Sequence, residues 1–303
     1  MANRPLTTEQ RNPASARLDE MSVESILYLM NEEDRRVPEA VARALPQIAA
    51  AVRALVEAWR SGGRWIYTGA GTSGRLAALD AAECQPTFGA PPERVLALLA
   101  GGSSAAARSV EGAEDDRAAA VRDLDSLALH PDDMVVGLAA SGRTPYVVSA
   151  VEYASRVGCA TVGISSNVGS ELGAAASVAI ELDTGPEVLT GSTRLKAGTS
   201  QKMVLNMLST AAFARLGKVY ENLMIDLQPA NEKLGQRARR IVCEATGLAE
   251  GEADELLGKA GGSVKIAVVM GKTGVSPGDA SRLLETVDGS VRQALRVSGE
   301  KRT

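Results

Sequence analysis

Glycines and hydroxyl side chains follow an apolar run in the first quarter of the chain. The run Trp65 to Thr68 leads directly into Gly69-Ala70-Gly71-Thr72-Ser73-Gly74-Arg75. Glycines permit a tight turn and a close approach of the backbone to a ligand, while hydroxyls and the first free N–H groups of a following helix donate hydrogen bonds. This stretch therefore predicts a strand-to-helix turn that binds a phosphate group.

A second loop has the same chemistry. Ser141-Gly142-Arg143-Thr144 follows the strand-like run Met134 to Ala140. Helix N-termini attract anions through their free N–H groups and the helix dipole, so we expect the two turns to meet at one ligand. The residues that we expect at the phosphate are Gly71, Thr72, Ser73, Ser141, Gly142 and Thr144.

The first turn has two other interpretations. Gly69 to Gly74 matches G-x-G-x-x-G, the dinucleotide-binding pattern. A dinucleotide site also needs an acidic residue at the end of the second strand, whereas Glu93 precedes that strand here. Glycine and serine are also common in ordinary turns, although two such loops at strand ends weaken this interpretation.

Carboxylates are the main candidates for proton transfer. The single histidine, His130, argues against histidine-based triads and multi-histidine metal sites, which leaves carboxylates, lysine or tyrosine. Glu83 lies eleven residues after Thr72, near the end of the helix that the first turn begins, and Glu114 lies in the helical segment after the second strand. Spacing alone is more typical of solvated surface carboxylates at both positions.

The elements around these residues alternate between strands and helices. Apolar residues at three- and four-residue steps predict a helix from Val37 to Trp59, and Pro46 is a candidate position for a kink. Five short apolar runs separated by amphipathic segments then predict an α/β fold with a doubly wound parallel five-stranded sheet, covered by helices on both faces. These runs are Trp65 to Thr68, Val95 to Leu99, Met134 to Leu138, Thr161 to Ile164 and Val178 to Leu182.

Three segments are expected along the chain. Residues 1–54 form an N-terminal arm with helices, residues 55–220 form the sheet domain and end in a long helix from about Leu195 to Leu216, and residues 221–303 form a small helical region. Within the last region, residues 240–300 resemble the ubiquitin-associated type of fold, and a plain packing appendage is the alternative.

Composition excludes several classes of protein. The 33 basic and 37 acidic residues give a net charge of -4, which provides no field for nucleic acid or an anionic membrane surface. Three widely spaced cysteines indicate neither a disulfide framework nor a metal site, and we find no signal peptide or apolar membrane span. We expect a cytoplasmic protein that binds a small molecule.

Several blocks of the sequence resemble one enzyme family. Those from 69 to 75, 80 to 84, 111 to 116 and 139 to 146 resemble the N-acetylmuramic acid 6-phosphate etherases. Residues 185–199, Gly-Pro-Glu-Val-Leu-Thr-Gly-Ser-Thr-Arg-Leu-Lys-Ala-Gly-Thr, resemble the signature that these etherases share with glucokinase regulatory proteins. The opening Thr8-Glu9-Gln10-Arg11-Asn12-Pro13 also fits, so the resemblance extends over most of the chain.

This resemblance implies a sugar isomerase (SIS) domain that binds phosphosugars, in a homodimer. Glu83 and Glu114 match the two glutamates with the acid and base roles in the family. Glu187 and Lys196 lie in the shared signature, and we expect them to bind substrate. In a dimer, Glu232 and Lys233 are candidates to reach the site of the neighbouring subunit.

The implied reaction removes D-lactate from N-acetylmuramic acid 6-phosphate, a step in cell-wall sugar recycling. Glu114 would take the C2 proton beside the C1 aldehyde of the open-chain sugar, and Glu83 would protonate the departing lactate and later help to deliver water to C3. The chemistry requires no metal or organic cofactor. The alternatives are a phosphosugar aldose–ketose isomerase, which leaves the ether intact, and a non-catalytic phosphosugar-binding regulator.

Overall fold

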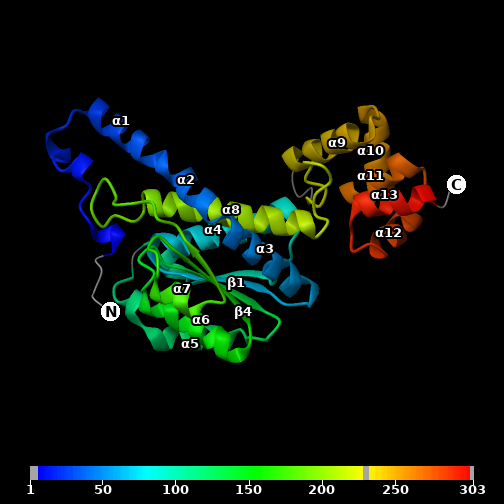
Figure 1. The fold of residues 1–303 in the computed structure, drawn as a ribbon. Coiled ribbons are helices and arrows are strands. Elements are labelled where there is room, and N and C mark those ends of the chain that lie inside the picture. Colours follow the sequence, from blue (N-terminus) through cyan, green and yellow to red (C-terminus); the bar gives the residue numbers. More distant parts are fainter. Residues whose placement is uncertain (1–5, 109, 228–231, 301–303) are drawn as a thin grey trace. The chain divides into compact units, whose positions relative to one another are not determined.

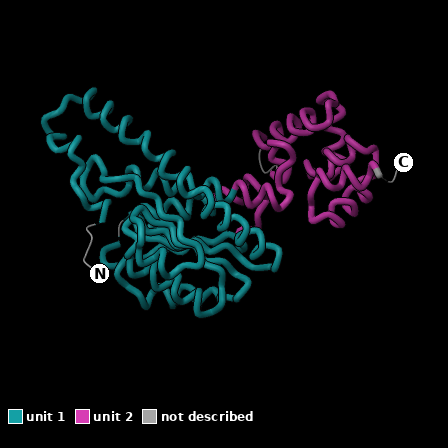
Figure 2. The backbone as a smooth tube through the Cα atoms, viewed as in Figure 1, with its two compact units in different colours: residues 1–81, 93–209 teal, residues 82–92, 210–303 magenta. Residues whose placement is uncertain are grey.

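The computed structural model describes residues 6–108, 110–227 and 232–300. These residues form two compact units, coloured separately in Figure 2. Unit 1 comprises residues 1–81 and 93–209, and unit 2 comprises residues 82–92 and 210–303. The three-segment division expected from the sequence remains a prediction.

A five-stranded sheet forms the centre of unit 1. All neighbouring strands are parallel, and their order is β2-β1-β3-β4-β5. Every residue of β1 and β3 is buried, which explains why apolar residues predominate in both strands, with Thr68 as the polar exception. The predicted doubly wound parallel sheet is therefore confirmed. The strands are β1 (Trp65–Gly69), β2 (Val95–Leu99), β3 (Met134–Leu138), β4 (Ala160–Ser165) and β5 (Val178–Glu181).

Helices cover both faces of this sheet (Figure 1). One face carries α6, which packs on β1, β3 and β4 and has α5 and α7 beside it, and α3 lies on the opposite face. Helix α6 buries seven of its thirteen residues, so it is part of the core of the unit. The helices after β1 are α4 (Gly71–Phe88), α5 (Arg117–Ser126), α6 (Pro145–Val157), α7 (Glu171–Ala175) and α8 (Lys196–Arg215).

The N-terminal part of unit 1 consists of short turns and three helices. Single 3-10 turns at Thr7–Glu9, Pro13–Ser15 and Leu18–Glu20 precede α1 (Val23–Asp34). The single helix expected from Val37 to Trp59 is two helices, α2 (Arg36–Arg43) and α3 (Leu45–Arg60), which meet at Ala44. Pro46 lies in the first turn of α3, where a missing N–H costs nothing, so it begins a helix instead of kinking one.

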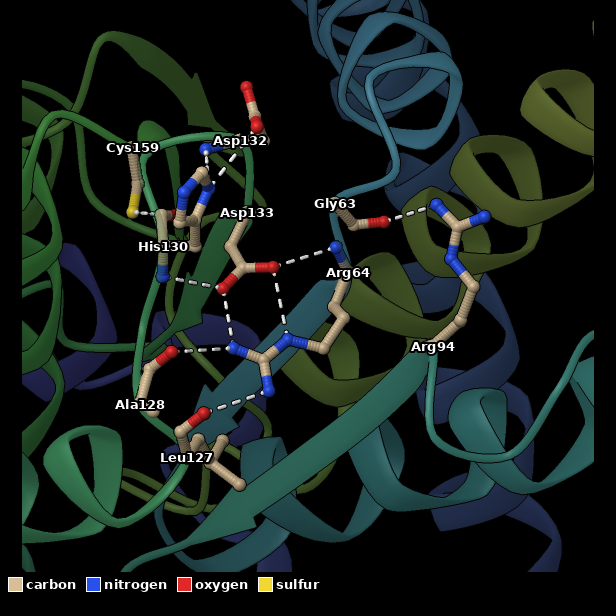
Figure 3. A network of polar contacts seen from close by, with 9 residues as sticks. All are labelled: Gly63, Arg64, Arg94, Leu127, Ala128, His130, Asp132, Asp133 and Cys159. Carbon is tan, nitrogen blue, oxygen red and sulfur yellow. Dashed lines mark hydrogen bonds and ion pairs between the residues drawn. The ribbon is translucent and has the colours of Figure 1, made fainter.

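A buried polar network lies before the strands, at the amino end of the sheet (Figure 3). The Arg64 guanidinium donates to both carboxylate oxygens of Asp133, at 3.0 and 2.6 Å, and the Arg64 and His130 N–H groups donate to the same carboxylate at 2.8 Å. Burial alone would raise the pKa of Asp133, but these donors together hold it below its ordinary value. The network joins the residues that begin β1 and β3.

Unit 2 is helical. Its core includes buried residues of α9 and α11, such as Val242, Ala267 and Val268, and Phe88 stacks on Phe213 with ring centroids 4.6 Å apart. Among the described residues, no helix combines the length and apolar character that a membrane span requires. The helices after α8 are α9 (Glu232–Thr246), α10 (Glu250–Lys259), α11 (Val264–Thr273), α12 (Pro277–Glu285) and α13 (Val291–Glu300).

Candidate active site

The strand order places the two predicted phosphate loops next to each other. Strands β1 and β3 are neighbours, and the chain leaves β1 toward β2 on one side and β3 toward β4 on the other. At such a switch point the loops after the two strands diverge and leave a crevice, which is where open α/β sheets bind ligands. The turns at 69–74 and 141–144 follow these two strands.

Glycines allow the close turn between β1 and α4. A Cβ atom on Gly69 would lie 2.7 Å from the backbone nitrogen of Gly74, and a Cβ on Gly74 would lie 2.6 Å from the Gly69 carbonyl oxygen. Helix α4 begins at Gly71, and the Gly74 N–H already donates to the Ala70 carbonyl at 3.1 Å. The N–H groups of the preceding helical residues therefore remain available to an anion.

Backbone conformation and a backbone hydrogen bond to α7 fix the loop after β3. Gly142 has φ +69, and a Cβ atom there would lie 2.4 Å from the Cβ of Ser170. The Gly142 carbonyl accepts from the Leu172 N–H at 2.8 Å, which ties the loop to α7. Thr144 precedes α6, and its side chain makes no capping hydrogen bond, so the hydroxyl is available to a ligand.

A cavity of about 490 Å³ lies at these two loops. Gly71, Thr72, Ser73, Ser141 and Thr144 line this cavity together with Glu114, and their binding of a phosphate group stays a prediction. Gly142 lies within the second loop but does not line the cavity. The lining residues are Glu9, Ala70, Gly71, Thr72, Ser73, Glu114, Asp115, Ala139, Ala140, Ser141, Arg143, Thr144, Pro145, Gly191 and Thr193.

Glu114 lies in a single 3-10 turn, Ala113–Asp115, and not in an α-helix. Helix α5 starts only after Asp116, whose side chain accepts from the Ala119 N–H at 2.8 Å, and this bond lowers the pKa of Asp116. Glu114 is exposed, and within the described part of the chain its side chain has no hydrogen-bond or ion-pair partner. Its carboxylate is therefore free to act on a molecule in the cavity.

Other predicted site residues lie elsewhere. Glu83 is exposed on α4, belongs to unit 2 and does not line this cavity. Lys233 lines a separate cavity on α9 with Arg237 and Arg240, and Glu232 is the first residue of that helix. The acid role of Glu83 therefore rests on the family resemblance alone.

Glu187 and Lys196 are buried at the start of α8. The Glu187 carboxylate accepts from the Lys196 and Ala197 N–H groups at 3.1 and 2.9 Å, and burial raises its pKa. The Lys196 ammonium lies 2.5 Å from the Glu33 carboxylate of α1. Neither signature residue lines the cavity, so in this structure both hold the helix start and the N-terminal segment in place.

Sequence reasoning missed several lining residues. Arg143 is inside the second predicted loop, and Asp115 follows Glu114, so the signals for both were adjacent to residues already chosen. Glu9 lies in the opening motif, where neither composition nor spacing indicates chemistry. Among the described residues, no group of three or more histidine, cysteine or acidic side chains is arranged to hold a metal ion.

Comparison with curated proteins gives closely similar sequences. The N-acetylmuramic acid 6-phosphate etherase of Geobacillus thermodenitrificans is 56% identical over 265 residues, which cover 88% of this chain and 90% of that protein. The etherases of Halalkalibacterium halodurans and Pasteurella multocida are 54% and 53% identical, over 87% and 88% of this chain and 89% and 88% of theirs.

Two domain families also match. Residues 47–155 match the glucokinase regulatory protein N-terminal SIS domain, and residues 116–211 match the SIS domain. Among solved structures, phosphoheptose isomerase from Francisella tularensis aligns with a TM-score of 0.49 at 17% identity, over 64% of this chain and 100% of that one.

Proposed function

Because this chain belongs to the N-acetylmuramic acid 6-phosphate etherase family, we propose that it cleaves the D-lactyl ether of N-acetylmuramic acid 6-phosphate. The products are N-acetylglucosamine 6-phosphate and D-lactate, and the enzyme acts as a carbon–oxygen lyase that then adds water. A cytoplasmic location and a role in peptidoglycan recycling are part of this proposal.

The phosphate group binds at the N-terminus of α4. The free N–H groups there, with the hydroxyls of Thr72, Ser73, Ser141 and Thr144, provide neutral donors and the positive end of a helix dipole. Arg143 is the one cation among the described residues that line the cavity. The sugar chain attached to this phosphate then extends past Glu114.

Glu114 is the base of the elimination. In the open-chain sugar the C1 aldehyde acidifies the C2–H bond, and the carboxylate takes that proton while the electron pair moves into the carbonyl as an enolate. Return of that pair forms the C2–C3 double bond and breaks the C3–O bond. Glu83 protonates the departing lactate oxygen, which leaves an α,β-unsaturated aldehyde.

Water then adds to the unsaturated aldehyde. Its oxygen bonds to C3, one of its protons goes to a carboxylate of the site, and C2 regains a proton, so the hydroxyl replaces the lactyl ether. Every proton that moves is carried by a carboxylate or by water. The reaction therefore needs one carboxyl group as base and another as acid, as acid and base pairs in enzymes provide.

One observation carries the proposal: the loops after β1 and β3 line the same cavity as Glu114, whose side chain has no partner among the residues that the structure describes. A phosphate site with a free carboxylate beside it suits removal of a proton from a phosphosugar. An aldose–ketose isomerase would need the same two features, so the fate of the ether decides between them.

Incubation with N-acetylmuramic acid 6-phosphate in ¹⁸O-labelled water tests the proposal. We expect free D-lactate without label and N-acetylglucosamine 6-phosphate with ¹⁸O at C3, because the C3–O bond breaks. N-acetylmuramic acid without phosphate is the matched control and should react far more slowly. Conversion to a ketose without lactate release would identify an isomerase, and binding without turnover would identify a regulator.

A homodimer is also part of the proposal. Helix α1 exposes Val23, Leu27 and Tyr28 at 67%, 61% and 70%, and Glu33 alone of its residues is buried. A helix with so many apolar residues gains stability when another surface covers it, and twofold pairing of identical subunits is the commonest arrangement. Light scattering at micromolar concentration should give a dimer mass, and Leu27→Glu should lower it. A monomeric parent protein would contradict this.

A further inference from the structure

Glu9 places a third carboxylate in the candidate active site. It is the last residue of the 3-10 turn Thr7–Glu9 and lines the cavity with Glu114 and Asp115, although more than 100 residues separate it from both in the sequence. The reaction proposed above uses Glu114 and Glu83 and assigns no task to Glu9.

The turn that carries Glu9 is fixed to the loops of the site. The Asn167 side chain accepts from the Thr7 N–H at 2.8 Å and donates to the Thr8 hydroxyl at 3.1 Å. The same amide donates to the Ala140 carbonyl at 3.0 Å, in the segment that follows β3. Thr8 and Asn167 are both buried, so the arm is anchored next to the cavity lining.

The Glu9 carboxylate is directed toward the lining segment at 191–193. A Cβ atom on Gly191 would lie 3.4 Å from Oε2 of Glu9, and Gly191 and Thr193 both line the cavity. Within the described part of the chain, the Glu9 side chain has no hydrogen-bond or ion-pair partner. An ionised carboxylate accepts hydrogen bonds and donates none, so its partner in the cavity must carry O–H or N–H groups.

We propose that Glu9 binds the hydroxyl groups of the substrate's sugar chain and thereby determines specificity for a phosphorylated polyol chain over other phosphate esters. This inference rests on the proposed function, because it takes the phosphate loops as the site of the phosphate group. Glu9 repels anionic groups, so it also favours the orientation in which the phosphate lies at α4. Asn167 is a positioning residue that acts through the Glu9 turn.

Binding measurements on Glu9 variants test this role. Calorimetry would compare N-acetylglucosamine 6-phosphate with inorganic phosphate, which lacks the sugar chain. Glu9→Ala should weaken binding of the sugar phosphate roughly tenfold to a hundredfold, the effect of one charge-assisted hydrogen bond, and leave phosphate binding within about twofold. Glu9→Gln keeps a neutral acceptor and should lie between. Glu20→Ala, also on the arm but away from the cavity, is the matched control.

Steady-state kinetics and a double variant complete the test. Glu9→Ala should raise KM with little change in kcat, whereas a loss in kcat alone would assign Glu9 to the chemical step and overturn the proposal. Asn167→Ala should reproduce the loss of sugar-phosphate affinity. The double variant with Glu9→Ala should bind sugar phosphate about as weakly as the Asn167→Ala single variant. Independent, additive losses would show that Asn167 does not act through Glu9.

The outcomes separate this inference from the proposed function. If the parent protein releases D-lactate and Glu9→Ala binds sugar phosphate like the parent, the specificity role is wrong and the etherase function stands. If the parent protein releases no lactate but its affinity for sugar phosphate depends on Glu9, the etherase function is wrong and the binding role of Glu9 stands. Equal losses for inorganic phosphate and sugar phosphate would contradict a role in binding the sugar chain.

Discussion

The carboxylates at the two ends of the sheet in unit 1 differ in burial and in hydrogen bonding. At the amino end, Asp133 accepts four hydrogen bonds from Arg64 and His130 and is almost completely buried (Figure 3). At the carboxyl end, Glu9 and Glu114 are exposed and, among the described residues, have no side-chain partner. The same strands connect the two ends, so backbone geometry is shared and only the side-chain chemistry differs.

This contrast separates stability from activity. Polar groups whose hydrogen bonds are already made within the protein stabilise the fold and have little left for a ligand. Groups that face a cavity without partners contribute little to folding and are available for chemistry. Substitutions at the carboxyl end should therefore change turnover with little change in stability, and those at the amino end should do the reverse.

The largest effect is expected at the two glutamates. Glu114→Ala should abolish both lactate release and exchange of the C2 proton with deuterated solvent, because the base acts first. Glu83→Ala should stop lactate release but leave the C2 proton exchangeable, since lactate leaves poorly without a proton. Each positioned acid or base contributes about 10²–10⁴-fold, so lactate assays and proton NMR would resolve the losses.

The thermal midpoint provides the control for these variants. Glu114→Ala should unfold at the same temperature as the parent protein, because the side chain it removes has no partner among the described residues. Exchange in the Glu114 variant and none in the Glu83 variant would reverse the two roles. Normal lactate release from both would remove these residues from the mechanism.

Asp133→Asn should have the next largest effect, on stability. Removing one partner of a buried ion pair costs about 3–5 kcal/mol, and kcat per folded molecule should stay at the parent value. The folded-state pKa of Asp133 lies below the unfolded value of about 3.9, so its stabilisation is present above that pH and is lost as pH falls through the folded pKa.

Denaturant unfolding at pH 7 and pH 3 would measure how much the Asp133 carboxylate stabilises the fold. The free-energy difference between parent and Asp133→Asn should be large at pH 7 and smaller at pH 3. A stable variant with lost activity would contradict the division between the two ends of the sheet.

The smallest effect is expected at Ser73. Losing one charge-assisted hydrogen bond to phosphate costs roughly 1.5–3 kcal/mol, so Ser73→Ala should weaken substrate binding about ten- to a hundredfold. Ser281→Ala, on α12, is the matched control and should bind like the parent, because the Ser281 hydroxyl donates only to the Glu285 carboxylate, at 3.1 Å, and does not line the cavity. Parent-like binding by Ser73→Ala would show that this hydroxyl is not a phosphate ligand.

The sequence predicted the sheet and both loops because their signals are local. Buried parallel strands require continuous apolar runs, and the glycines at 69 and 74 are required by a turn that involves only adjacent residues. The turn that carries Glu9 is bonded to Asn167, which is distant in sequence, so no local pattern places Glu9 at the cavity. Glu187 and Lys196 were chosen through a shared signature, and a signature alone does not distinguish a buried helix anchor from a ligand contact.

The anchoring of the N-terminal arm has a consequence for biosynthesis. Thr7 bonds to Asn167 across 160 residues, and Lys196 bonds to Glu33 across 163. A ribosome that adds about 5–20 residues per second needs on the order of 10–30 s to complete such a span, and during this time Thr7 and Glu33 lack these partners. The arm is therefore synthesised well before the residues that anchor it, and a chaperone has this interval in which to bind the segment.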